Sequence, residues 1–140
     1  MNVNFLAIII ATIAEFVIGA IWYMPLFGTL WGKIHGFDSQ SKEAQDQMRK
    51  KMMPLLLVQL LITFVTTWVL AVVMGNNAQG WSAYCIAALC WIGFVVPTQV
   101  AGVIFGGTNP KWIVTKTLVM AGGSLACLEA AALILSMMSK

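Results

Sequence analysis

The chain contains four apolar stretches that are each long enough to cross a lipid bilayer. They cover residues 4–24, 54–74, 81–105 and 111–138. The hydrocarbon core of a membrane is about 30 Å thick, and about 20 residues of α-helix span it. Only helices and closed barrels satisfy every backbone group in lipid, and these continuous runs lack the polar–apolar alternation of barrel strands. The sequence therefore predicts an all-α integral membrane bundle of four transmembrane helices.

The composition supports this class and excludes others. Hydrophobic residues make up 60% of the 140 residues and charged residues 9%, whereas soluble domains carry about 25% charged residues. The length allows one transmembrane domain, residues 1–140, without a second core. The net charge of +3 arises mainly in one loop, so we expect no nucleic-acid partner. The first stretch has no basic residues before it, as a signal peptide would. We therefore expect that it is not cleaved and remains as a helix.

Most of the charge lies in the one long connection, residues 25–53. Eight of the thirteen formally charged residues fall between Lys33 and Lys51. Lysine and arginine are enriched on the cytoplasmic side of membrane proteins. Of the eight lysine and arginine residues in the whole chain, seven lie on the same side of the bundle as this loop. We therefore predict a cytoplasmic loop and non-cytoplasmic termini. Within the loop, Asp38, Ser39 or Ser41 can cap a short solvated helix that leads into the second stretch, and Pro54 suits that stretch's first turn.

Two carboxylates fall inside the apolar stretches. Glu15 lies in the middle of the first stretch and Glu129 in the outer half of the last. A charge at such depth costs about 3 kcal/mol on insertion scales, so it must be paired, protonated or facing water. Small residues, which mark faces where helices approach closely, surround both positions. They are Ala7, Ala11 and Gly19 for Glu15, and Gly122, Ala126 and Ala130 for Glu129.

These faces predict that both glutamates point into protein, either within one chain or between subunits. One interpretation is that they bind or relay a cation or a proton. The other is that each is a protonated hydrogen-bond donor with a structural role.

Polar residues in the second and third stretches are candidates to line a pathway. Gln59, Thr63, Thr66 and Thr67 recur on one face of the second stretch, and Gln99 follows a proline that can kink the third. The two glutamines should lie at similar depth in antiparallel helices, so we expect them to be partners. The alternative is that these side chains only join helices by hydrogen bonds. The candidates for transport or ion binding are Glu15, Glu129, Gln59, Gln99 and Thr63.

The remaining polar and sulfur-containing residues give no sign of catalysis. Lys116 is about 20 Å along the helix from Glu129, too far for a salt bridge, and is expected to anchor at the interface. We expect His35 to be a solvated loop residue. The three cysteines read as free buried thiols, with a Cys90–Cys127 bridge as the alternative. We identify no catalytic residue and no metal site, and expect no cofactor.

An aromatic segment follows the first stretch. Trp22, Tyr23 and Trp31 are expected to anchor the chain at the membrane interface, where such rings are enriched. The alternative is a re-entrant element that faces a ligand.

This segment resembles the signature of a bacterial family of small four-helix membrane proteins, catalogued only as a domain of unknown function. The matching residues are Gly19, Trp22, Tyr23, Pro25, Phe27, Gly28 and Trp31, with Trp91, Gly93 and Phe94 in the third stretch. The resemblance covers the length and order of the spans. It implies a multi-pass protein of the bacterial inner membrane, and it implies no activity.

Three functions compete. The first is a small channel or an ion- or proton-coupled transporter that works as a homo-oligomer, since four helices leave little room for a pathway in one chain. The second is a non-catalytic accessory or assembly subunit that binds a partner membrane protein. The third is an intramembrane enzyme acting on a lipid or a quinone, which is disfavoured because nothing positions a nucleophile or a metal.

Overall fold

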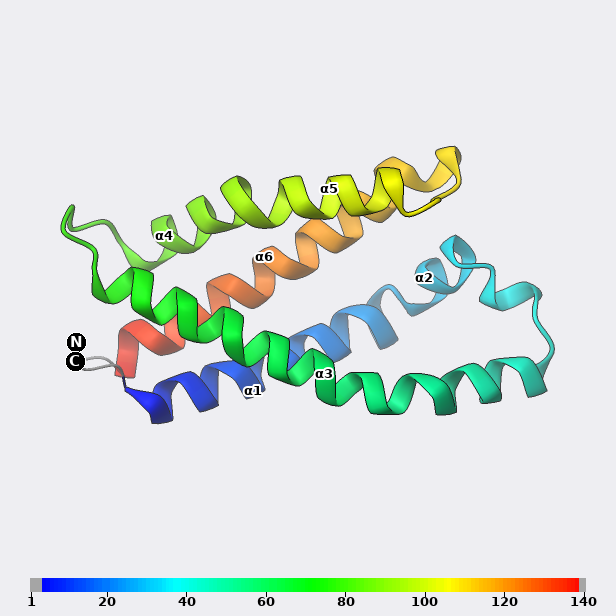
Figure 1. The fold of residues 1–140 in the computed structure, drawn as a ribbon, viewed down its shortest axis with the longest axis horizontal. Helices are drawn as coiled ribbons and strands as arrows, with labels where there is room; N and C mark the ends of the chain where they lie inside the picture. The colour runs from blue at the N-terminus through cyan, green and yellow to red at the C-terminus, as the bar shows by residue number, and fades with distance from the viewer. Residues whose placement is uncertain (1–3, 139–140) are drawn as a thin grey trace.

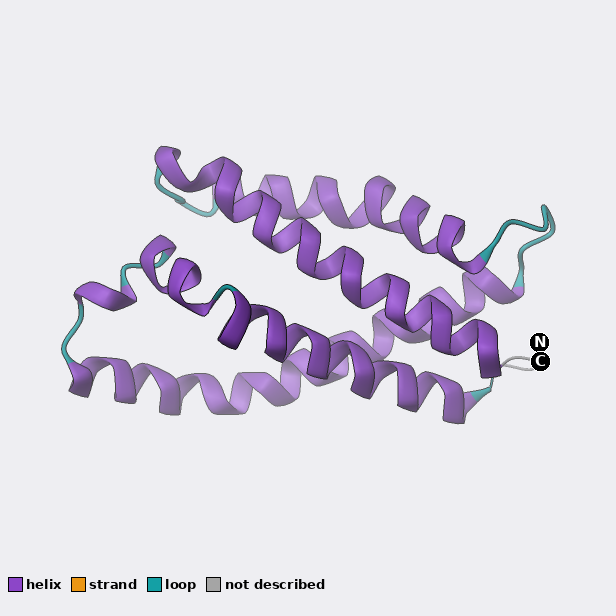
Figure 2. Ribbon diagram, turned by 180° about the vertical axis from the view of Figure 1, so that it is seen from behind, coloured by secondary structure: helices purple, strands orange, loops and turns teal. Residues whose placement is uncertain are grey.

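The computed structural model describes residues 4–138 and contains only helices and short connections over that range (Figure 2). Four of its helical segments are long and apolar enough to cross a membrane. They are Phe5–Leu26, Lys42–Gly75, Ala83–Phe105 and Pro110–Met138. The prediction of an all-α protein with four transmembrane helices is confirmed.

The first span combines two kinds of helix. Helix α1 (Phe5–Ile21) begins at Asn4, whose side chain accepts a hydrogen bond from the Ala7 amide at 3.2 Å. It continues into a π-helical turn, Trp22–Leu26, closed by a bond from the Phe27 amide to the Trp22 carbonyl at 2.9 Å. The predicted end of the first helix at residue 24, before Pro25, was therefore wrong, because the π-helical turn carries the span through this proline to Leu26.

The long connection is largely helical. It contains the short helix α2 (Gly28–Ile34) and a 3₁₀ turn (Phe37–Ser39), and then enters the 34-residue helix α3 (Lys42–Gly75). The Ser41 hydroxyl caps α3 by accepting a bond from the Ala44 amide at 3.3 Å. The predicted helix that leads into the second span is confirmed.

Pro54 lies in the interior of α3, so the prediction that it occupies a first turn was wrong. The charged segment before it already forms helix, so Pro54 falls inside a longer helix, where it lacks the N–H group that would bond the Lys50 carbonyl and its ring crowds that carbonyl. At 1.5 Å per residue α3 is about 51 Å long, which exceeds a bilayer core, so its first turns extend beyond the membrane.

The third span repeats the pattern of the first. Helix α4 (Ala83–Cys90) passes through a π-helical turn, Trp91–Val95, into α5 (Val96–Phe105). A 3₁₀ turn (Pro110–Trp112) then leads into α6 (Ile113–Met138). Both π turns therefore begin at a tryptophan.

Helix α6 contacts α1, α3, α4 and α5. The start of α1 and the end of α6 lie at one end of the bundle, and α2 lies at the other (Figure 1). We call the latter the α2 end. At the opposite end Asn4 Nδ2 donates to the Met138 carbonyl at 2.9 Å, which fixes the antiparallel register of α1 and α6.

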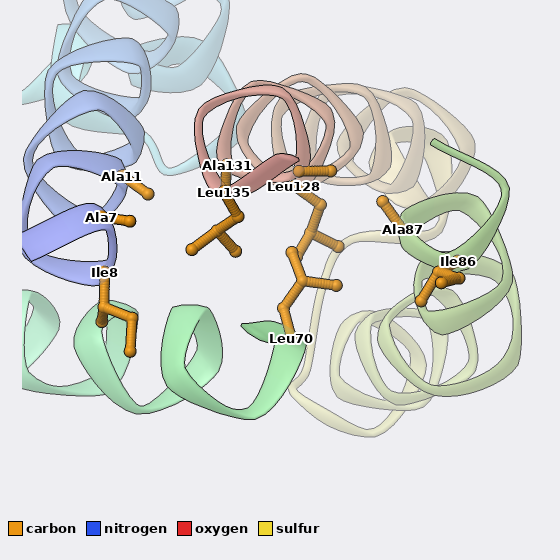
Figure 3. Packing of buried hydrophobic residues seen from close by; sticks show 10 residues of the cluster. Ala7, Ile8, Ala11, Leu70, Ile86, Ala87, Leu128, Ala131 and Leu135 are labelled. Carbon is orange, nitrogen blue, oxygen red and sulfur yellow. The ribbon is translucent and has the colours of Figure 1, made fainter. Parts of the chain in front are cut away.

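The core lies in the half of the bundle away from α2. Side chains from α1, α3, α4 and α6 converge there (Figure 3). Many are alanines, which allow helices to pack closely in lipid, where apolar burial alone gives no driving force. The outward faces carry exposed large apolar residues, as expected for a protein surrounded by lipid.

Candidate functional site

Glu15 is enclosed in protein. Its residue is only 5% exposed, and it lies on the same stripe of α1 as Ala7 and Ala11, which are completely buried. The prediction that Glu15 faces other helices is confirmed.

Thr67 of α3 lies beside the Glu15 carboxyl group. The Thr67 residue is completely buried, and its hydroxyl donates to the Thr63 carbonyl of its own helix at 2.8 Å. A hydroxyl has a single proton to donate. While that bond is made, the Thr67 oxygen can only accept from Glu15, which requires a protonated carboxyl. An ionised carboxylate requires the hydroxyl to turn towards it.

One carboxyl oxygen of Glu15 is unsatisfied. Glu15 Oε1 is buried and has no hydrogen-bond partner among residues 4–138. Buried polar groups in folded proteins are nearly always hydrogen-bonded, so this oxygen is an exception.

Helix α6 contacts the backbone of α1 at Glu15 through Cys127. The Cys127 thiol lies 3.5 Å from the backbone carbonyl of Glu15 and donates to it. All three cysteines are free. The prediction of free thiols is confirmed, and the alternative Cys90–Cys127 bridge is wrong. The prediction that the thiols are buried was wrong, because Cys85 is exposed and Cys90 and Cys127 are half-buried.

Glu129 does not share this site. It follows Cys127 by two residues, which places it about 200° around α6, on nearly the opposite side of the helix. Glu129 is half-buried, and Leu133, one turn further along the same face, is 41% exposed. Glu129 Oε2 is buried without a hydrogen-bond partner in the described chain. One chain therefore keeps its two intramembrane carboxyls apart.

The two candidate glutamines have different partners. Gln59 is exposed, and its amide nitrogen lies 3.4 Å from the Thr63 hydroxyl in the same helix. Gln99 Oε1 accepts from the Ser124 hydroxyl of α6 at 3.5 Å. The prediction that they pair with each other was wrong, because similar depth does not fix the directions in which two helices present their side chains. Thr63 is buried and bonds the Gln59 carbonyl at 2.9 Å.

Two tryptophans hold the first half of α6 through hydrogen bonds to its backbone, an arrangement that we call the clamp. The Trp22 indole donates to the Val119 carbonyl at 2.9 Å. The Trp91 indole donates to the Ala121 carbonyl at 2.9 Å and lies 3.2 Å from the Ser124 hydroxyl. Each π turn thus delivers its first side chain to α6.

Two adjacent glycines of α6 make room for the Trp22 ring, a role that the sequence did not predict. A Cβ atom on Gly123 would come within 2.9 Å of the Trp22 ring, and one on Gly122 within 3.0 Å. Adjacent glycines in the middle of a transmembrane helix are the sequence signal that a bulky group packs there. The predicted interface role of Trp22 remains a prediction beside this observed packing role.

The other predicted anchors meet at the α2 end. The rings of Tyr23 and Trp31 pack edge to face at 4.9 Å. Lys116 Nζ lies 5.9 Å from the centre of the Trp31 ring and donates to the Thr108 hydroxyl at 3.2 Å. Their predicted role as interface anchors stays a prediction.

We also looked for groups of metal-ligating residues and for hollows in the described chain. No group of three or more His, Cys, Asp or Glu residues suited to a metal ion is found within residues 4–138. An open hollow of about 290 Å³ lies between α3 and α4 at the end away from α2. Asn76, Asn77, Gln79 and Trp81 are among the residues that line it, and Glu15 is not.

The comparisons with known proteins identify a family without an activity. A family model described as "Protein of unknown function (DUF1761)" matches residues 6–136. No curated protein and no solved structure matches the chain. Since the family match covers nearly the whole sequence, the chain belongs to the DUF1761 family of proteins of unknown function.

Proposed function

We propose that this protein is a small homo-oligomeric membrane channel or transporter for protons or cations, in which Glu15 is the group that exchanges the proton. One observation carries the proposal: Glu15 lies in the middle of the first span, 5% exposed, with a carboxyl oxygen that has no partner in the described chain. Ionisable residues at such a position are costly, and they commonly mark ion pathways or proton relays.

The neighbouring threonine supplies a simple switch. With the Thr67 hydroxyl bonded to the Thr63 carbonyl, the pair suits a protonated Glu15. When Glu15 loses its proton, the Thr67 hydroxyl turns and donates to the carboxylate. Release and uptake of a proton then require only a rotation of one hydroxyl group, without movement of a helix.

The position of Glu129 supports the oligomeric part of the proposal. It lies on the side of α6 away from the Glu15 site, half-buried and with an unpartnered oxygen within residues 4–138. A second copy packed against this side would cover the carboxyl and complete a polar path at a symmetric interface.

We also propose an orientation. The α2 end, with its excess of lysine and arginine, faces the cytoplasm of a bacterial cell, and both termini lie on the opposite, non-cytoplasmic side of the inner membrane.

Proton flux into liposomes tests the function. The purified protein is reconstituted with an internal pH-sensitive dye, and a potassium diffusion potential drives protons inward. We expect flux with the wild type, loss of flux in Glu15→Gln and reduced flux in Glu129→Gln. Glu43→Gln, the same substitution at an exposed position outside the core of the bundle, is the control and should keep wild-type flux.

Two outcomes contradict the proposal. Unchanged flux in Glu15→Gln excludes this residue as the proton-exchanging group. Absence of proton flux in the wild type excludes proton transport and favours an accessory subunit, which co-purification of a stoichiometric partner in mild detergent would then show.

A further inference from the structure

Three elements bring a cation, a hydroxyl and an indole ring together at the α2 end. Lys116 comes from the first turns of α6, Thr108 from the turn before it, and Trp31 from α2. Lys116 Nζ lies 3.2 Å from Thr108 Oγ1 and 5.9 Å from the centre of the Trp31 ring. Residues far apart in the sequence thus form one compact site.

The Lys116 ammonium has only neutral partners in the described chain. Its contacts are the Thr108 hydroxyl and the Trp31 ring, and no carboxylate lies within ion-pair distance among residues 4–138. The Lys116 residue is half-buried. A partly desolvated ammonium is stable when an anion accompanies it.

The depth of the Lys116 ammonium in the membrane indicates which anion can reach it. Lys116 lies six residues into the fourth span, Pro110–Met138, but its side chain reaches back to Thr108, which precedes that span. Long basic side chains near the ends of transmembrane helices place their charge at the headgroup level in this way. The anion present at that level in a bilayer is the phosphate of a lipid.

We propose that Lys116, Thr108 and Trp31 form a binding site for the phosphate group of an anionic phospholipid. An ammonium has three donors, and only one is used by Thr108, so two remain for phosphate oxygens. The Thr108 hydroxyl accepts from Lys116 and keeps its own proton for the same phosphate.

The aromatic wall of the site is held in place from two sides. Trp31 packs against Tyr23 at 4.9 Å and against His35 at 4.4 Å between ring centroids. His35 is itself bonded through Nδ1 to the Trp31 carbonyl at 2.9 Å. A fixed indole at the headgroup level covers the glycerol end of the lipid. This inference does not depend on the proposed transport function.

Lipid-dependent thermal stability tests the site. The full chain, in a neutral mild detergent, is titrated with short-chain phosphatidylglycerol, short-chain phosphatidylcholine or inorganic phosphate, and unfolding is followed by tryptophan fluorescence. We expect a saturable rise in the melting temperature with phosphatidylglycerol, a weaker effect with phosphatidylcholine and none with phosphate. Lys116→Gln should weaken the apparent affinity for phosphatidylglycerol by about tenfold or more, through loss of a charge-assisted hydrogen bond.

Lys111→Gln is the matched control. Lys111 also lies over a tryptophan, with its Nζ 5.5 Å from the centre of the Trp112 ring, but it is exposed. It should keep wild-type affinity. Equal losses in the two variants would mean unspecific attraction by basic residues and would overturn the proposal. An equal rise in melting temperature with inorganic phosphate would show that the site binds the free ion and would overturn the proposal of a lipid ligand.

A second variant keeps the test decisive if Lys116→Gln does not fold. Thr108→Val leaves the charge in place and removes the hydroxyl, and it should weaken phosphatidylglycerol binding severalfold. Wild-type affinity in Thr108→Val would contradict the site as described.

Discussion

The indole nitrogen of Trp22 donates to the backbone carbonyl of Val119 at 2.9 Å, which joins the end of the first span to the first half of the last. The same two helices meet again where the Cys127 thiol lies 3.5 Å from the Glu15 carbonyl. Together with the Asn4–Met138 bond, the tryptophan contact therefore sets the register that holds Glu15 against α6. Loss of this contact should loosen the Glu15 site.

Filling the space beneath Trp22 should destabilise the protein. In Gly123→Ala the new Cβ would lie 2.9 Å from the ring, and overpacking of this kind costs about 1–3 kcal/mol. Gly102→Ala is the control, because a Cβ there meets nothing within 4 Å. Thermal unfolding in detergent should show a lower melting temperature for Gly123→Ala only. Equal melting temperatures for the two variants would contradict the packing.

The two clamping indoles should each contribute a hydrogen bond. Trp22→Phe and Trp91→Phe keep a ring but remove the N–H group, and each should lower the free energy of unfolding by about 0.5–1.5 kcal/mol, plus a smaller packing loss. Trp68→Phe, at a position that is 44% exposed, should have little effect. Denaturant unfolding of the three variants makes the comparison. A loss at Trp68 as large as at Trp22 would argue against the clamp.

The proposed orientation can be tested with single cysteines. In a chain with its three native cysteines replaced by alanine, Asn77→Cys and Ser39→Cys place thiols at opposite ends of the bundle. An impermeant maleimide added to intact bacterial cells (with their outer membrane permeabilised) should label Asn77→Cys and not Ser39→Cys. The reverse pattern would show that the basic end faces away from the cytoplasm.

The hydroxyl beside Glu15 should matter for flux. Thr67→Val removes the group that alternates between the Thr63 carbonyl and Glu15, and flux should fall severalfold. Thr66→Val is a close control: its hydroxyl also bonds the carbonyl four residues earlier, Ile62, at 3.0 Å, but the residue is exposed. Liposome flux should distinguish the two. Similar flux in both variants would exclude the hydroxyl switch.

The sequence was sufficient for features that depend on local pattern. Four continuous apolar runs predicted the spans, and Ala7 and Ala11, at four-residue steps from Glu15, predicted the buried face of α1. Ser41 was among the predicted caps for the helix that leads into the second span. Each of these follows from residues within a few turns of one another.

Features that depend on relations between helices were not predictable from the sequence. The opposite positions of Glu15 and Glu129 around α6 follow from the rotation of α6 about its axis, which the spacing in the chain does not fix. The partners of Gln59 and Gln99 depend on that rotation too. The π turns at Trp22 and Trp91 bring side chains to α6 from different spans, which no local pattern indicates.

The central claim is that Glu15 exchanges its proton in the folded protein, and infrared spectroscopy of the reconstituted protein tests it most directly. Difference spectra recorded as the pH of the bath changes report the C=O stretch of a protonated carboxyl. We expect a carboxyl band that appears and disappears reversibly with pH, is missing in Glu15→Gln and persists in Glu43→Gln. A Glu15 band that does not change over the pH range in which the protein stays folded would show a sealed structural carboxyl and would contradict the account.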